Sequence, residues 1–301
     1  MKGFCKYGLY FVLLLITNIA TAGQKFKSLE DFSRYTQGHF MIDMAWLEPV
    51  TFQGYLDAGS VSSRSSSPMY IDTGVGAAGP AIQLIAQAFG TKHARNRQYS
   101  KAQQDADQVL AEHVDKIADL SIEEFYFDFK KIAELKQYSV EVFTPEKKSG
   151  DFFIRMEPVF MLSQDMRSVM LRNKVQIHHR KRIRKPIFKQ QFVVVSKPIE
   201  FENISQFWQQ KGDDNLRQLS QNLFKKSIIL MLDELSEKHV SESKQKTFRY
   251  KFGDTAMFER ASLTKSRLQT EHCDRSNVIT LGGDIMSLPI PAPECGAPQG
   301  N

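Results

Sequence analysis

VMLRNKVQI, residues 169–177, is the stretch that decides the fold of this chain. Its odd-numbered residues are apolar with the exception of Asn173, whereas Arg172, Lys174 and Gln176 between them are polar. A two-residue repeat of this kind predicts a strand that buries one face. Strand-like composition also marks three neighbouring segments, 138–143, 151–162 and 187–195. Because the connections between the four segments are short, they predict an antiparallel meander.

A long amphipathic helix is predicted after the meander, over residues 214–239. Leucine and methionine side chains recur there at helical spacing, and Asp213 suits the N-cap. Three further strand candidates follow at 247–252, 257–268 and 277–287. The sequence therefore predicts an α+β fold over residues 137–288, in which an antiparallel sheet packs against one long amphipathic helix.

Residues 23–136 form a separate N-terminal region with an additional helical segment. Its first part, 23–58, has the composition of weak strands, and the serine-rich stretch 59–68 is predicted to be a flexible loop. Apolar residues at helical spacing predict a helix over 100–120. A capping box predicts a second helix over 122–136.

Residues 74–90, GVGAAGPAIQLIAQAFG, carry no charge. Gly74, Gly76 and Gly79 match the glycine spacing of a dinucleotide-binding turn. The second parallel strand and the acidic residue of that fold do not follow, so no nucleotide cofactor is expected. The seventeen residues of the stretch, which include Gln83 and Gln87, are marginal for a transmembrane span. A buried core helix and a segment that contacts a membrane surface or a partner both remain open.

Residues 1–22 have the layout of a secretory signal peptide. Lys2 and Lys6 precede an apolar run of residues 8–16, and small residues follow at 20–22. The apolar run is much shorter than the roughly 20 residues of a membrane-spanning helix. We therefore expect an exported protein, periplasmic or secreted. At the other end, four prolines within 289–301 predict a disordered tail.

Export determines what the charge and the cysteines imply. The formal net charge of +6 includes the two lysines of the leader, and the small surplus that remains argues against nucleic-acid binding. Cys5 lies in the leader, which leaves Cys273 and Cys295 as candidates for a disulfide in an oxidising compartment. No metal site is expected, because His272 is the only further ligand nearby.

The sharpest charge feature is HHRKRIRK, residues 178–185, between two predicted strands. Like charges packed this closely repel one another and need solvent or an anionic partner. One interpretation is a solvated hairpin turn that prevents strands from pairing edge to edge. The other is a contact with an anionic surface, made by five side chains: Arg180, Lys181, Arg182, Arg184 and Lys185.

Catalytic motifs are absent or weak in this sequence. Ser241 and Lys244 have the S-x-x-K spacing, but they fall in a polar region without a core to shield them. The sequence therefore favours a non-enzymatic protein of the cell envelope that binds an envelope protein or an anionic lipid or glycolipid surface. Two alternatives stay open: an exported hydrolase with a dispersed site, and a membrane-associating subunit that uses residues 74–90.

Overall fold

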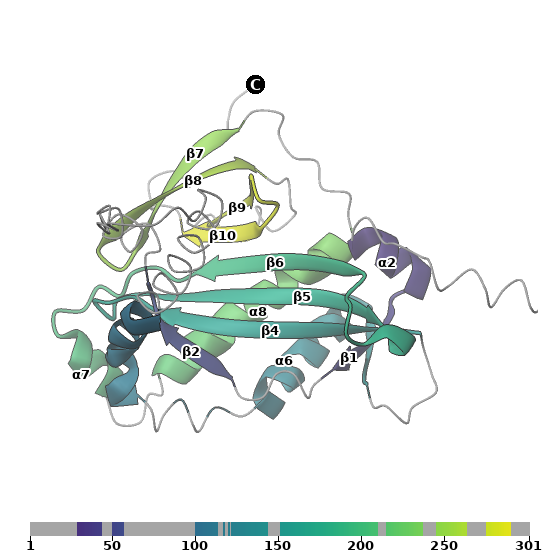
Figure 1. Ribbon diagram of the computed structural model, residues 1–301, viewed down its shortest axis with the longest axis horizontal. Coiled ribbons are helices and arrows are strands. Elements are labelled where there is room, and N and C mark those ends of the chain that lie inside the picture. The colour runs from purple at the N-terminus through teal and green to yellow at the C-terminus, as the bar shows by residue number, and fades with distance from the viewer. Residues whose placement is uncertain are drawn as a thin grey trace, which may run out of the picture.

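The computed structural model consists of a large, mostly antiparallel sheet with helices on one face (Figure 1). The structure describes the following residues: 29–43, 50–56, 100–113, 117, 120, 122–143, 151–209, 215–236, 245–263 and 275–289. Within them, ten strands form one sheet in the order β3-β1-β4-β5-β6-β10-β9-β8-β7, with β2 paired to β4 beside this path.

The centre of the sheet is the three-stranded meander β4 (Phe152–Leu162), β5 (Val169–His179) and β6 (Phe188–Val195). Each strand pairs antiparallel with the next, and β4 and β5 pair along their whole length. The prediction of a mixed α+β fold with a mostly antiparallel sheet is therefore confirmed.

The predicted position of the first strand in the meander is wrong. β3 (Ser139–Val142) does not pair with β4, because β1 (His39–Asp43) lies between them and runs parallel to both. A strand parallel to β4 cannot form a hairpin with it. β2 (Thr51–Gly54) also runs parallel to β4. These partners lie about a hundred residues upstream of β4, beyond the reach of a local pattern.

The second part of the sheet contains β7 (Lys246–Phe252), β8 (Thr255–Leu263), β9 (Arg275–Thr280) and β10 (Ile285–Pro289). β7 to β10 pair antiparallel in succession, and β10 joins β6 in parallel. The predicted strand 277–287 is therefore two strands, separated by a turn that contains Gly282 and Gly283. Pro289, which the sequence places in the tail, ends β10 and is buried.

Three helices cover one face of the sheet: α2 (Leu29–Thr36), α6 (Ile122–Leu135) and α8 (Asn215–Ser236). α8 packs against β5 and β6, with α2 and α6 beside it (Figure 1). The predicted helix 214–239 corresponds to α8, which shares its face of the sheet with the other two helices. α2 replaces part of the weak strands expected over 23–58, because Leu29 and Phe32 recur at helical spacing and are fully buried.

Shorter helical pieces complete the described part of the fold. Residues 100–107 are helical and continue into the 3-10 helix η3 (Gln108–His113), and α7 (Ile204–Gln209) precedes α8. The predicted helix 122–136 corresponds to α6. Within the described residues, no helix combines the length and the apolar character that crossing a bilayer requires.

Asn173, the polar exception in the decisive stretch, faces the helices. Its amide nitrogen donates a hydrogen bond to the Ser227 hydroxyl of α8 (3.1 Å), and this hydroxyl donates to the carbonyl of Phe224 (2.9 Å). Val175 and Ile177 on the same face of β5 belong to the main apolar cluster. The polar pair therefore gives the contact between α8 and β5 a defined register in an otherwise apolar interface.

Candidate functional site

The candidate site is the cationic turn, residues 180–185, which connects β5 to β6 at one end of the sheet. It begins with the short 3-10 helix η4 (Arg180–Arg182). The main-chain N–H of Arg180 donates to the carbonyl of Asp151, and that of Ile187 donates to the carbonyl of Ile177, both at 2.8 Å. These bonds fix both ends of the turn to the sheet.

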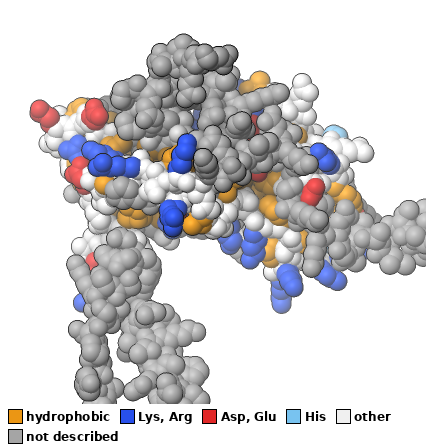
Figure 2. Space-filling model, turned by 90° about the horizontal axis from the view of Figure 1, so that it is seen from above, with side chains coloured by type: hydrophobic (Ala, Val, Ile, Leu, Met, Phe, Trp, Pro, Cys, Tyr) orange, Lys and Arg blue, Asp and Glu red, His pale blue; other side chains and the backbone are white. Residues whose placement is uncertain are grey.

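The structure brings all five predicted contact residues together in this turn. Arg180 is half-buried, and Lys181, Arg182, Arg184 and Lys185 are exposed. Ile183, between two arginines, is 42% exposed and is one of few large apolar side chains on the described surface. Figure 2 shows several Lys and Arg side chains projecting together at the lower right, the side on which Figure 1 draws this turn.

The structure corrects the placement of the two histidines at the start of the cationic segment. His178 and His179 belong to β5 and are buried, because the β4 ladder continues to the pair Phe152 and His179. The His178 ring stacks on Phe153 with centroids 5.4 Å apart, and the His179 ring meets Phe152 edge-on at 5.0 Å. The histidines therefore form the base of the turn and not its exposed tip.

The surroundings of His178 disfavour a positive charge on its ring. Burial lowers the pKa of its ring below that of an exposed histidine, and the positive charge of Arg155 lowers the pKa further. The main chain of Ile183 and the carboxylates of Asp43 and Glu157 act in the opposite direction without cancelling the shift. Neither ring nitrogen has a hydrogen-bond partner of standard geometry within the described residues. The charge of the site thus comes from its Lys and Arg side chains.

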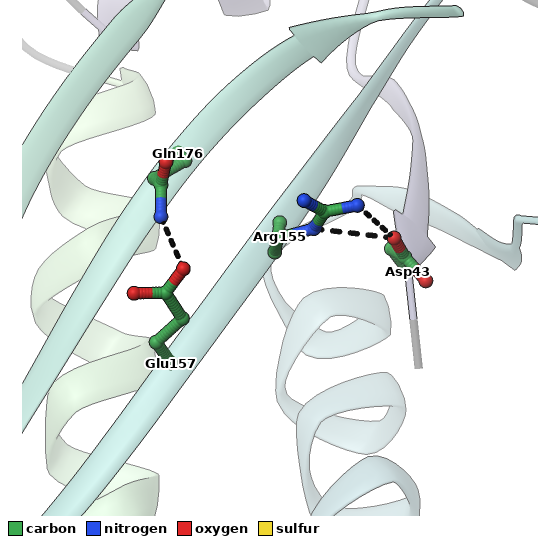
Figure 3. Close-up of polar contacts among 4 residues, drawn as sticks. All are labelled: Asp43, Arg155, Glu157 and Gln176. Atoms are coloured by element: carbon green, nitrogen blue, oxygen red, sulfur yellow. Dashed lines mark hydrogen bonds and ion pairs between the residues drawn. The ribbon is translucent and has the colours of Figure 1, made fainter. Parts of the chain in front are cut away.

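A polar network on the sheet face opposite the helices was not predicted from the sequence (Figure 3). Arg155 of β4 donates to one carboxylate oxygen of Asp43 in β1, from Nη2 at 2.8 Å and from Nε at 3.3 Å. Glu157 accepts from the Gln176 amide at 2.5 Å and from the Lys174 ammonium at 2.6 Å. Each carboxylate is neutralised by a cation, so the network joins strands β1, β4 and β5 and offers no acid–base pair.

The sequence indicates only the part of this network that lies on β4. Arg155 and Glu157 alternate with apolar residues in 151–162, which places both on the less apolar face of that strand. Asp43 lies 112 residues from Arg155, and no local pattern connects them.

A pocket of about 330 Å³ lies next to the cationic turn. Its lining includes Tyr35, His39, Glu141, Asp151 and Phe152. It adjoins the turn in two ways, since Arg180 binds the Asp151 carbonyl and the Phe152 ring contacts His179. Within the described residues, no three His, Cys, Asp or Glu side chains are grouped so that they could hold a metal ion.

Several predicted features lie outside the described residues. These are the leader 1–22, the serine-rich loop 59–68, the uncharged stretch 74–90, Ser241 with Lys244, Cys273 with Cys295, and residues 290–301 of the tail. The disulfide and the cleaved leader therefore stay predictions.

No protein-family model matches the chain, and no match was found among curated proteins or solved structures. The function is therefore inferred from the geometry of the chain itself.

Proposed function

We propose that this protein is an exported, non-enzymatic protein of the cell envelope that binds an anionic lipid surface through the cationic turn. The observation that carries the proposal is the gathering of five Lys and Arg side chains in one short turn, four of them exposed. Each such cation close to an anionic lipid surface contributes about 1 kcal/mol to binding. The leader-like sequence at residues 1–22 supports export.

Exposed apolar side chains favour a lipid surface over an acidic protein. Ile183 lies between Arg182 and Arg184, so an apolar group is presented together with the charges. Tyr35 of α2 is 39% exposed, and it belongs to the same end of the molecule because its ring contacts Phe152 at 5.4 Å. Cations combined with an aliphatic and a tyrosine side chain suit the boundary between headgroups and acyl chains.

The experiment removes the charge of the turn and measures binding to vesicles. The variant carries Gln at all five positions: Arg180, Lys181, Arg182, Arg184 and Lys185. We expect its affinity for vesicles that contain phosphatidylglycerol, measured by co-sedimentation at low salt, to fall by roughly three to four orders of magnitude. Wild-type binding should weaken as salt is added, because salt screens exposed charges.

A matched control removes five exposed cations elsewhere and leaves the turn intact. It carries Gln at Lys101, Lys130, Lys131, Lys251 and Arg260, all exposed. Both variants have the same net charge, so a specific role of the turn predicts a much smaller loss for the control. Equal losses, or wild-type binding by the turn variant, would exclude the turn as the contact. Replacing Ile183 with Ser should weaken binding only several-fold.

A further inference from the structure

We propose that the pocket beside the cationic turn binds the ammonium group of a phosphoethanolamine lipid headgroup while the turn holds the phosphate. This inference rests on the proposed function, since it adds recognition of a zwitterionic headgroup to the binding of an anionic surface by the same turn. It adds a second subsite of opposite charge to the contact.

The two subsites are adjacent because Asp151 and Phe152, at the start of β4, lie beside both. Asp151 and Phe152 line the pocket. The Asp151 carbonyl accepts from the N–H of Arg180, the first residue of the turn, at 2.8 Å. In phosphoethanolamine only two carbons separate the amine from the phosphate ester oxygen. A ligand this short needs an acidic and a basic subsite side by side, and the β4–β5 pairing places them so.

The lining of the pocket suits an organic ammonium group. Two acidic residues, Glu141 of β3 and Asp151, line the pocket, and both are exposed. Carboxylates form short, charge-assisted hydrogen bonds with an ammonium group. The exposed ring of Tyr35 adds aromatic surface that attracts a cation, whereas the Phe152 ring 5.4 Å from it is buried. A primary ammonium has three donors for these oxygens, whereas the trimethylated amine of choline has none.

The size of the pocket selects a headgroup and not a whole lipid. A volume of about 330 Å³ is at the lower end of the range for small-molecule sites. It accommodates the aminoethyl group, and the acyl chains stay in the bilayer next to Ile183 and Tyr35.

Asp151 should affect two kinds of lipid in opposite directions. Its carboxylate attracts the amine of phosphatidylethanolamine, but it repels phosphatidylglycerol, which has only a negative charge. The decisive variant is therefore Asp151→Asn combined with Glu141→Gln, which keeps the shape of both exposed side chains and removes their charge.

The experiment compares this double variant with wild type on three kinds of vesicle. Phosphatidylcholine vesicles contain either phosphatidylethanolamine, phosphatidylglycerol or neither, and binding is measured by co-sedimentation. We expect the double variant to bind phosphatidylethanolamine vesicles about tenfold more weakly, as the loss of one charge-assisted hydrogen bond implies. Its binding to phosphatidylglycerol vesicles should be unchanged or stronger. The control Glu123→Gln with Glu202→Gln removes two exposed charges elsewhere and should behave as wild type.

The outcomes separate this inference from the proposed function. If the double variant binds phosphatidylethanolamine vesicles as wild type does, the pocket is not the ammonium subsite. The proposed function fails separately, if the five-Gln turn variant binds phosphatidylglycerol as wild type does. A last arm adds free phosphoethanolamine as competitor. If it displaces the vesicles at a concentration no higher than that of the lipid headgroups, the ligand is a soluble compound and the lipid assignment is overturned.

Discussion

Asp165 connects two turns that lie far apart in the sequence. One carboxylate oxygen accepts from the Ser163 hydroxyl at 2.6 Å and from the Arg167 N–H at 3.1 Å, and the other accepts from the Asp254 N–H at 2.5 Å. Gly253 has a φ of 62°, and a Cβ at this position would lie 2.2 Å from the carboxylate. The turn between β7 and β8 can approach Asp165 this closely only because the residue there is glycine.

Asp165 should make stability depend on acid pH. Burial alone raises the pKa of this carboxyl, but the hydrogen bonds outweigh that effect and the pKa lies below its usual value. The unfolded chain therefore binds the proton more tightly, so this stabilisation is present above about pH 4 and is lost as the pH falls through the lowered pKa. We expect Asp165→Asn to reduce the free energy of unfolding in urea by about 1–2 kcal/mol at neutral pH.

The pH profile provides the check on this prediction. The difference between wild type and Asp165→Asn should shrink as the pH falls from about 5 to about 2, because protonation then removes the charge from wild type as well. The exposed Asp105→Asn should follow the wild-type profile. A difference that stays constant over this range would show that the charge of Asp165 contributes nothing.

At the scale of single residues, the sequence predicts the local setting of a side chain but not its contacts with residues that are distant along the chain. It predicted that the five cations lie in a turn, because consecutive like charges before a proline fit few places other than an exposed turn. It could not predict the burial of His178 and His179, because that burial depends on their contacts with two phenylalanines of the neighbouring strand β4. Asp165 illustrates the same limit, since Asp254 lies 89 residues away.

β2 and the helix at 100–107 contact each other through Gly54. The Gly54 N–H donates to the Asp107 carboxylate at 2.7 Å, and the Gly54 carbonyl accepts from the Gln103 amide at 3.0 Å. A Cβ on Gly54 would lie 1.8 Å from the carbonyl oxygen of Ala106. The strand and the helix can therefore meet only where the strand has no side chain.

Gly54→Ala should separate these two elements. The clash is with main chain, which cannot rotate away as a side chain can, so we expect a loss of about 3 kcal/mol or more in the free energy of unfolding. Thermal unfolding monitored by circular dichroism measures the effect. Gly282→Ala is the matched control, because its Cβ would meet only a threonine hydroxyl at an ordinary 3.6 Å. Equal melting temperatures for both variants would contradict this account of the contact.

At the scale of elements, the sequence predicts strands and helices from local patterns better than it predicts which distant strands pair. Short windows of sequence predict β5 from residue spacing, β4 and β6 from strand-like composition, and α6 from its capping box. The position of β1 between β3 and β4 does not, since His39 to Asp43 is remote in sequence from both of its partners. The division of 277–287 into two strands is marked in the sequence by Gly282, Gly283 and Asp284, a turn signal that the prediction of one continuous strand overlooked.

Over the whole molecule, the same strands contribute to two apolar clusters on opposite faces of the sheet. Leu171 of β5 belongs to the cluster under the helices, whereas the adjacent Met170 belongs to the cluster shared with β7 to β10. β6 likewise contributes Val194 to the first cluster and Val195 to the second. Because β10 also pairs directly with β6, neither half of the sheet can unfold without exposing strands of the other.

Unfolding of the described sheet should therefore be a single cooperative transition that depends on both clusters. Leu171 and Met170 are both almost fully buried, so replacing either with Ala should cost about 2–5 kcal/mol. Differential scanning calorimetry should show the same transition shifted to lower temperature in each variant, with no new peak, and the exposed Lys189→Ala should leave it in place. The opposite result is equally clear: if Met170→Ala produced an early transition and left the remainder at the wild-type temperature, β7 to β10 would be an independent unit. The parallel contact between β6 and β10 would then join two domains and would not lie within a single one.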